Sequence, residues 1–267
     1  MRPDAVLITG TTSGIGRALL AHYSANGAAV IAVNRRRDPE LEAQFPGVRF
    51  ECLDVRSAEG IERLIESLAH SDAIPDVFIL NAGINRVDND ASFELAEFRA
   101  VVETNLFGVA NFVQPLTRLG PLDKPRHVVV IGSMASYVGN PYGLGYHVSK
   151  QALKACSDVW SHMYSGTDLV FQHVLLGPIR TPMYSMAEQF PAWVVRVRDA
   201  FSASLDDTVR AISGFAKGRR KRLYAPRRAA LLYFCMWLAQ RLIPGFFRGR
   251  KTLAGTARRT LADRGTQ

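Results

Sequence analysis

A tyrosine and a lysine four residues apart, Tyr146 and Lys150, form the pair in this sequence that best suits proton transfer. On a helix this spacing places both side chains on one face, so the ammonium group can lie near the phenol. A free phenol has a pKa of about 10 and is a weak base at neutral pH. A cation about 4 Å away, at an effective dielectric near 20, contributes on the order of 4 kcal/mol, or roughly three pKa units. We therefore predict that Lys150 lowers the pKa of Tyr146 and makes it a general acid and base.

Ser133 is a second polar residue in a position that suits chemistry. It follows the apolar run 128–132, which predicts a buried strand, so its hydroxyl should lie at the carboxyl end of that strand. There it can hydrogen-bond a substrate oxygen on which charge develops. The alternative interpretation is an ordinary turn serine, as Tyr146 and Lys150 could be ordinary surface neighbours on a helix.

The first apolar run leads into a glycine-rich turn, Thr9-Gly-Thr-Thr-Ser-Gly-Ile-Gly16. Glycines let the backbone turn tightly and approach a pyrophosphate, whose charge is met by amide groups at the start of the next helix. The turn therefore predicts a dinucleotide site. We expect it to be contacted by Gly10, Thr12, Ser13, Gly14, Ile15 and Gly16.

The elements that would position these residues alternate between strands and helices. Apolar runs predict strands at 5–9, 28–33, 48–53, 77–80, 128–132 and 169–175. Helical periodicity predicts helices at 14–26, 57–69, 97–119 and 146–164. This order is typical of an α/β fold with a doubly wound parallel sheet flanked by helices, whose ligands bind at the carboxyl ends of the strands.

Together these motifs resemble the short-chain dehydrogenase/reductase family. The family pattern T-G-x-x-x-G-x-G is matched at the first turn, and further matches extend to about residue 182. They are Asp54-Val55, Asn81-Ala82-Gly83, Asn105, Ser133, Tyr146-x-x-x-Lys150 and Gly177-Pro-Ile-Arg-Thr181. The resemblance implies a Rossmann-like fold and hydride transfer between a nicotinamide cofactor and a carbonyl or alcohol.

The resemblance also implies roles for individual residues. Tyr146 would exchange the proton, Ser133 would orient the substrate carbonyl, and Lys150 would also bind the nicotinamide ribose. Asn105 would hold a water that connects Lys150 to solvent, although a polar residue that merely interrupts a helix is the alternative. Ile179 and Thr181 would contact the carboxamide, in a loop whose Gly-Pro order departs from the family's usual Pro-Gly.

The end of the second strand predicts the choice of cofactor. NAD-binding folds usually place an acidic residue there for the ribose 2′-hydroxyl, whereas arginine accommodates a 2′-phosphate. Here the strand ends in Asn34 and Arg35, so we predict NADP(H), with NAD(H) as the alternative. By resemblance, Asp54 and Val55 lie against the adenine, and residues 81–83 line the adenosine side. No His/Cys/Asp cluster predicts a metal site.

The charge of +9 is distributed unevenly along the chain. Residues 217–267 hold 14 Lys or Arg and one acidic residue, so this segment carries +13 and residues 1–216 carry −4. The apolar run 229–239 is short for a membrane span, and the basic residues around it suit a helix lying on an anionic bilayer. Packing on its own domain or on a second subunit is the equal alternative. The aliphatic bulk argues against nucleic acid.

We thus expect a catalytic domain over 1–225, with a substrate flap and helix at 183–217, and a basic amphipathic extension over 226–267. Three widely spaced cysteines and the absence of a signal-like start favour a reducing, cytoplasmic location, with peripheral membrane contact through 226–251. A lipophilic substrate fits the apolar flap, and the resemblance favours a homo-oligomer. A nucleotide-sensing scaffold without activity, with a tail that binds membrane or protein, is the competing hypothesis.

Overall fold

Parallel strands form the centre of the molecule. A computed structural model describes residues 5–86, 94–139, 143–181, 192–216, 218 and 220–243. Within these ranges a seven-stranded sheet has the order β3-β2-β1-β4-β5-β6-β7, and every neighbouring pair is parallel. The strands are β1 (Ala5–Thr9), β2 (Ala29–Asn34), β3 (Arg49–Cys52), β4 (Val77–Leu80), β5 (Arg126–Ser133), β6 (Leu169–Leu176) and β7 (Arg222–Ala225). The predicted doubly wound α/β fold is confirmed.

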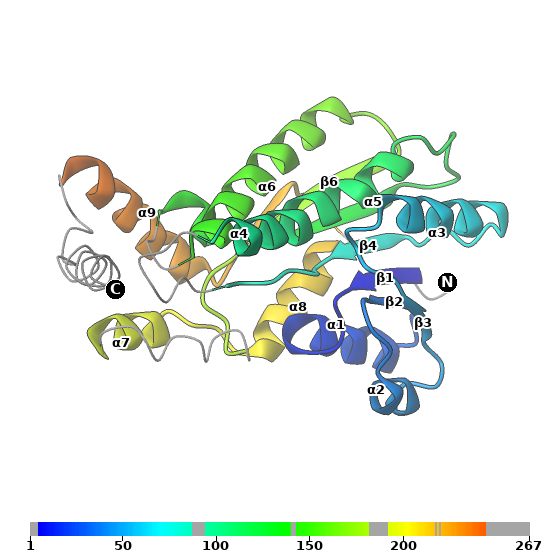
Figure 1. The fold of residues 1–267 in the computed structure, drawn as a ribbon, viewed down its shortest axis with the longest axis horizontal. Helices are drawn as coiled ribbons and strands as arrows, with labels where there is room; N and C mark the ends of the chain where they lie inside the picture. The colour runs from blue at the N-terminus through cyan, green and yellow to red at the C-terminus, as the bar shows by residue number, and fades with distance from the viewer. Residues whose placement is uncertain are drawn as a thin grey trace, which may run out of the picture.

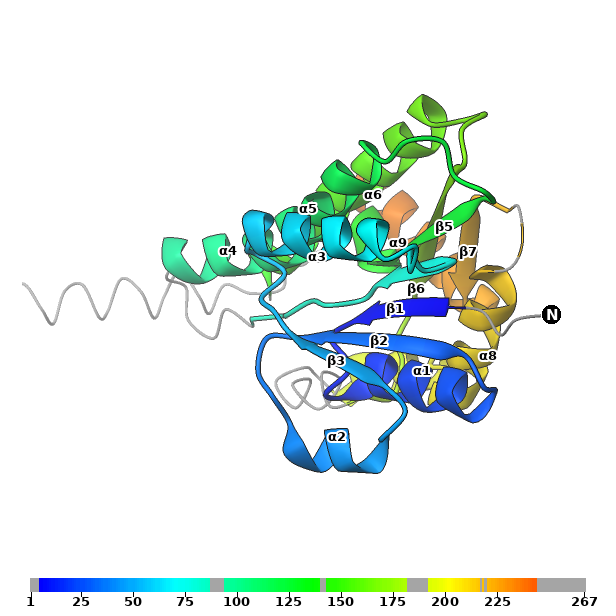
Figure 2. The ribbon, with the colours of Figure 1, turned by 90° about the vertical axis from the view of Figure 1, so that its right-hand side faces the viewer.

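Helices cover both faces of this sheet, as Figures 1 and 2 show. One face carries α1 (Gly14–Ala25), α2 (Pro39–Gln44) and α8 (Leu205–Ala216), which bury a cluster of aliphatic side chains against β1, β2 and β6. The other face carries α3 (Ala58–His70), α4 (Leu95–Val102), α5 (Gly108–Leu116) and α6 (Leu144–Met163). There α3 and α5 form the second core cluster, which includes the fully buried Phe78 and Phe112. Strands buried on both faces explain their nearly continuous apolar sequence.

The single helix predicted over 97–119 is wrong. The chain instead forms α4, a π-helical turn η1 (Glu103–Phe107) and α5, which ends at Leu116. Periodicity alone cannot place such a turn, because one wide turn leaves the pattern of apolar residues nearly unchanged. The reason for its position is Asn105, whose side chain bonds to the backbone of Ile84 outside the helix. π-Helical turns are often found at functional sites.

Two short elements are absent from the expectations drawn from sequence. Strand β7 is four residues long, begins with the exposed Arg222 and lies at the edge of the sheet, so it lacks an apolar run. Helix α2 begins at Pro39 after Asp38, whose carboxylate accepts a hydrogen bond from the Leu41 amide at 3.0 Å. Six residues are too few for a helical period to be recognised.

The segment expected to form a flap is described in part. Residues 182–191 lie outside the described residues, and α7 (Ala192–Ala200) follows them. Ser204 lies directly before α8, where its hydroxyl accepts from the Asp207 amide at 3.1 Å and donates to the Asp207 carboxylate at 2.6 Å. This capping begins α8.

The last described helix, α9 (Arg227–Leu242), follows β7 and packs on β7 and on the 3-10 turn η2 (Met134–Tyr137). Ala229 is fully buried there, and Gly177 faces it so closely that a Cβ at Gly177 would lie 2.7 Å from the Ala229 Cβ. None of the described helices combines the length and the apolar character that crossing a bilayer requires. The basic residues 248, 250 and 251 lie outside the described residues.

Candidate active site

The carboxyl ends of neighbouring strands bring the predicted site residues to one edge of the sheet. Thr9 ends β1, Asn81 follows β4, and Ser133 ends β5 beside Leu176 of β6. The hydroxyl of Thr9 accepts hydrogen bonds from the amides of Asn81 and Ala82, both at 2.9 Å. These bonds tie the glycine-rich turn to the loop after β4, so the two predicted cofactor segments lie together.

Tyr146 and Lys150 lie on the first turns of α6 and face the same edge. The Lys150 Nζ lies 5.8 Å from the centroid of the Tyr146 ring and donates a hydrogen bond to the Ile131 carbonyl oxygen at 3.0 Å. The lysine is buried, with 6% of its surface exposed. The helix therefore places both groups on one face, as their spacing predicts.

The predicted effect of Lys150 on Tyr146 is wrong for this structure. Burial raises the pKa of Tyr146 above its ordinary value, and the hydroxyl of Ser133 opposes this rise only in part. Burial also lowers the pKa of Lys150 to about 8. The prediction fails because spacing along a helix gives proximity but not desolvation, which disfavours both the phenolate and the ammonium.

Ser133 lies where the sequence predicts it. The residue is buried, and its Oγ accepts from the Ala135 amide at 3.1 Å, which begins the turn η2. Its own contact with the Leu176 carbonyl is long, at 3.4 Å. Ser133 is the last residue of β5, and its hydroxyl also acts on the pKa of the Tyr146 phenol.

Asn105 connects three parts of the site. Its Oδ1 accepts from the Ile84 amide at 2.8 Å, and its Nδ2 donates to the Ile84 carbonyl at 2.9 Å and to the Ser149 Oγ at 3.1 Å. Ser149 is the residue before Lys150 on α6. Fully buried Asn105 thus fixes the loop after β4 against α6. Gly83 lies beside it, since a Cβ there would be 3.2 Å from the Asn105 Oδ1.

The glycine-rich turn has the shape of a phosphate cradle. A Cβ on Gly16 would lie 2.0 Å from the Gly10 carbonyl oxygen, and Gly10 itself has a φ of +72°. The N-cap Ser13 makes no side-chain hydrogen bond, so the first amides of α1 are left for another acceptor. A Cβ at Gly14 would lie 3.6 Å from the Cβ of Thr181. The predicted cofactor residues 14 and 181 therefore lie close together beside the start of α1.

The end of β2 shows one residue that the sequence analysis missed. Thr11 donates from its backbone amide to the Asn34 Oδ1 at 2.7 Å, and the Asn34 Nδ2 donates to the Thr11 Oγ1 at 2.8 Å. Asn34 is buried, so its amide holds the glycine-rich turn. Thr11 lies inside the glycine-rich turn Thr9–Gly16, and this position was the sequence feature that could have identified it.

Arg35 directly follows Asn34, and the other predicted cofactor residues lie after β3 and after β6. Arg35 is exposed, and Asp54 forms an ion pair of 2.7 Å with Arg56 that holds the pKa of Asp54 below its usual range. Val55 is buried against Gly108, where a Cβ would lie 2.7 Å from it. Ile179 is buried and pairs with Ala203 in an isolated bridge.

Comparisons with known proteins agree with this geometry. The family model described as short chain dehydrogenase matches residues 4–191. The chain belongs to this family. The 3-oxoacyl-(acyl-carrier-protein) reductase FabG of Thermotoga maritima is 28% identical over 183 residues, covering 66% of this chain and 74% of the relative. The NADPH-dependent pterin aldehyde reductase of Arabidopsis thaliana is 30% identical over 164 residues, covering 58% of this chain and 63% of the relative.

Solved structures show the same fold. The ligand-free aldohexose dehydrogenase of Thermoplasma acidophilum has a TM-score of 0.71 at 20% identity and covers 84% of this chain and 92% of its own. A structure described as ElxO with NADP bound has a TM-score of 0.72 at 20% identity, covering 83% and 96%. Membership of the short-chain dehydrogenase family makes this chain an oxidoreductase that acts on carbonyl or alcohol groups.

An aromatic cavity of about 410 Å³ lies next to the catalytic edge of this short-chain dehydrogenase, and sequence reasoning missed it. Its walls are Met134, Tyr137, Tyr224, Ala230, Tyr233, Phe234 and Trp237. Met134 directly follows Ser133, and four of the lining residues belong to α9. Packing of α9 on its own domain was one of the two alternatives, but the contact between residues 134–137 and 230–237 is not visible in a local pattern.

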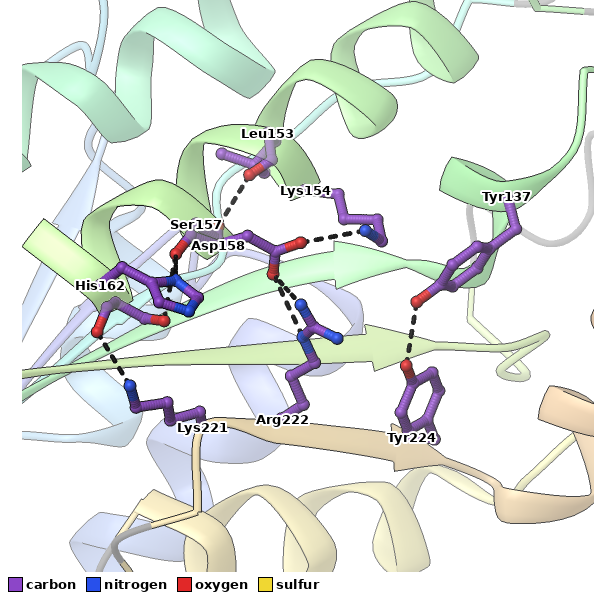
Figure 3. A network of polar contacts seen from close by, with 10 residues as sticks. Tyr137, Leu153, Lys154, Ser157, Asp158, His162, Lys221, Arg222 and Tyr224 are labelled. Atoms are coloured by element: carbon purple, nitrogen blue, oxygen red, sulfur yellow. Dashed lines mark hydrogen bonds and ion pairs between the residues drawn. The ribbon is translucent and has the colours of Figure 1, made fainter.

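Two tyrosines of the cavity wall, Tyr137 and Tyr224, lie beside the polar network drawn in Figure 3. The hydroxyl groups of Tyr137 and Tyr224 are hydrogen-bonded at 2.9 Å. On α6, Asp158 pairs with Lys154 at 3.0 Å and with Arg222 of β7 at 2.6 Å. Edge strand β7 is therefore fastened to α6, which fixes the position of Tyr224 in the cavity wall.

We predict that Gly16→Ala weakens NADPH binding roughly tenfold or more, because the new Cβ forces the turn away from the Gly10 carbonyl. The quenching of protein fluorescence by NADPH measures this. Gly47→Ala is the control, since nothing lies within 4 Å of a Cβ there. Equal affinity of the two variants would contradict the assignment of the cradle.

Proposed function

We propose that this chain is an NADP(H)-dependent oxidoreductase that reduces or oxidises a lipophilic carbonyl or alcohol compound. One observation carries the proposal. Ser133 ends β5 directly before Met134 of the apolar cavity, Tyr146 and Lys150 share one face of α6, and the glycine-rich turn lies at the same carboxyl edge of the sheet. The coupling of a proton donor to an apolar site suits carbonyl chemistry.

In the proposed mechanism each side chain has a separate task. Ser133 donates to the substrate oxygen and orients it, while Tyr146 gives that oxygen its proton during reduction and takes it back during oxidation. When bound, the nicotinamide supplies or accepts the hydride. Lys150 is held by the Ile131 carbonyl and would bind the ribose hydroxyls of the cofactor, and Asn105 keeps the loop after β4 against α6. A phenol carries its proton at neutral pH, and burial raises the pKa of Tyr146 further, so the group is in the form that reduction requires.

We predict that Tyr146→Phe lowers kcat by on the order of 10²–10⁴-fold, because the variant has no proton to transfer to the substrate oxygen. NADPH binding should stay within a factor of about two, as the phenol is not part of the glycine-rich cradle. Turnover is followed by NADPH absorbance, and affinity by fluorescence. A variant that retains its kcat would remove Tyr146 from the mechanism and favour the sensing scaffold.

The preference for NADP(H) is supported by the end of β2. No carboxylate lies at the final position of β2, where Asn34 is engaged by Thr11. Arg35 follows, is exposed, and its side chain makes no ion pair with any described residue. Arg37 by contrast is paired with Glu42 at 2.6 Å. Arg35 is thus free to bind a 2′-phosphate, for which a guanidinium has a matching geometry.

We predict that Arg35→Asp shifts the ratio of kcat/KM for NADPH over NADH by about tenfold or more toward NADH, because the variant repels a phosphate and accepts a hydroxyl. Arg36→Asp is the matched control, since it makes the same change of charge one residue away. The two ratios are measured with one carbonyl substrate. An equal shift in both variants would mean that overall charge, and not Arg35, sets the preference.

The lipophilic substrate is supported by the chemistry of the cavity. Its walls are aromatic or aliphatic, and the hydroxyls of Tyr137 and Tyr224 satisfy each other. A cavity of about 410 Å³ is within the range of sites for small organic ligands. An apolar body would fill it, while the reacting oxygen faces Ser133.

Contact with an anionic membrane is the second part of this proposal, and α9 supports it. One face of α9 packs on the domain, while another exposes Leu231, Phe234, Leu238 and Leu242, of which Leu231 is 65% exposed. The guanidinium of Arg241 lies 4.3 Å from the centre of the Trp237 ring. The sequence beyond 243 adds further basic residues without a compensating cluster of acids. An apolar stripe with basic neighbours suits the headgroup region of an anionic bilayer.

We predict that Leu231→Glu with Leu238→Glu, introduced in the full chain, strongly reduces flotation with phosphatidylserine-containing vesicles. Two carboxylates on the exposed stripe would be repelled by the lipid surface and could not enter it. Val159→Glu on α6 is the control, since Val159 is also about half exposed but lies on another helix. Unchanged flotation of the double variant would dismiss this surface as the lipid contact.

A further inference from the structure

A buried histidine, His173, lies beside the active-site end of β5. It belongs to β6, where it pairs with Val130 of β5, and only 2% of its surface is exposed. Neither of its ring nitrogens has a hydrogen-bond partner among the residues that the structure describes. Because burial of a polar ring without partners is unfavourable, stability alone does not explain a histidine at this position.

The ring of His173 occupies the space in which a side chain of Gly132 would lie. A Cβ at Gly132 would be 2.0 Å from the His173 Nε2 and 2.9 Å from its Cδ2. Atoms that are not bonded to each other cannot approach so closely. The flat imidazole and the glycine are therefore a matched pair, and the ring packs directly on the backbone of Gly132.

Both members of this pair face α6. Side chains alternate along a strand, so His173 points to the same side of the sheet as Phe171. Gly132 shares its side with Val130 for the same reason. Phe171 and Val130 belong to the core cluster on the α6 face, and the Phe171 ring lies 6.0 Å from that of Trp160 on α6. The imidazole is thus enclosed by β5, β6 and α6.

Gly132 lies between two groups that the candidate site uses. The carbonyl of the preceding residue, Ile131, accepts the hydrogen bond from the Lys150 Nζ at 3.0 Å. The following residue, Ser133, carries its hydroxyl at the end of β5. Any displacement of Gly132 would therefore move the acceptor of the lysine and the serine hydroxyl together.

The charged groups around His173 keep its ring neutral. Burial lowers the pKa of His173 to about 3, and the charge of Lys150 is the second cause. Lys154 on α6 and Arg222 on β7 act in the same direction, whereas Asp158 on α6 opposes them. A neutral ring adds no further cation to a region that already holds the buried ammonium of Lys150.

We propose that His173 is a positioning residue of the active site. Its imidazole fixes Gly132 by contact, so that the Ile131 carbonyl stays in place for Lys150. The same contact holds the Ser133 hydroxyl where it can meet a substrate oxygen. The inference rests on the proposed function for the tasks of Lys150 and Ser133. It adds a residue of β6 that acts through the backbone of its neighbour.

The first test exchanges both members of the pair, with kcat measured for NADPH and 1-phenyl-1,2-propanedione per NADPH-binding site. His173→Ala frees Gly132 and should lower kcat about tenfold, and Gly132→Ala should lower it about 10²-fold through the clash. In the double variant the lost ring makes room for the new methyl group, so kcat should be at least about fivefold above that of Gly132→Ala. One substitution would thus be harmful in one background and beneficial in the other.

Two single variants distinguish positioning from a structural role. Phe171→Leu is the matched control, because Phe171 is also buried on this face of β6 but lies two residues further from the active site. It should lower the melting temperature and leave kcat within a factor of about two. His173→Leu should lower kcat without lowering the melting temperature, since the ring has no hydrogen bond to lose within the described part of the chain.

The second test needs no turnover. The rate at which an amine reagent modifies Lys150 is measured by mass spectrometry, with Lys124, whose side chain is 53% exposed, as the internal reference. Loss of a fixed Ile131 carbonyl should raise this rate severalfold in His173→Ala and not in Phe171→Leu. Faster modification of Lys150 in a protein whose wild type does not turn over the dione would support the role of His173 and count against the proposed function.

Three outcomes would overturn the inference. One is a His173→Ala variant with the kcat and the Lys150 modification rate of the wild type. Another is a double variant that is no faster than Gly132→Ala. The third is Phe171→Leu matching His173→Ala in both kcat and modification rate, because general loosening of the core would then account for the effect.

Discussion

The hydrogen bond from Lys150 to the Ile131 carbonyl is the contact on which the candidate site depends. It holds a buried ammonium with no acidic partner among the described residues, which is energetically costly unless the surrounding polar groups are fixed. The backbone of β5 supplies the acceptor, and the same strand ends two residues later in Ser133. Residues 131–133 of β5 therefore position both Lys150, through the Ile131 carbonyl, and the hydroxyl of Ser133.

The same burial determines the protonation of the site. Desolvation disfavours charge on Tyr146 and on Lys150, so the two groups differ from the cation-stabilised phenolate that their spacing suggests. Their environment is sensitive to any further charge brought into the site. For this reason neighbouring residues that hold no charge, such as Asn105 and Ser149, are well suited to keep the helix and the loop in contact.

Much of the architecture follows from local sequence, and the exceptions have physical causes. The buried strands and the glycine-rich turn are predictable because apolar runs and glycine spacing are local signals. The π-helical turn at Asn105 is not, because it depends on a bond to Ile84, 21 residues away. Likewise Thr11 and Asn34 are each polar residues near a turn until the fold joins them. The aromatic cavity requires contact between η2 and α9, about a hundred residues apart, which no periodic pattern contains.

Because α9 forms much of the cavity wall, the reacting groups and the cavity surface come from different parts of the chain. The groups suited to proton transfer lie within residues 4–191, where the family model matches, whereas much of the cavity surface is contributed after residue 222. Changes in the late segment can therefore alter which molecules fit while leaving the reacting groups untouched. Such modularity gives an evolving lineage a route to new specificities, in which exchange of one terminal helix substitutes for redesign of the interior.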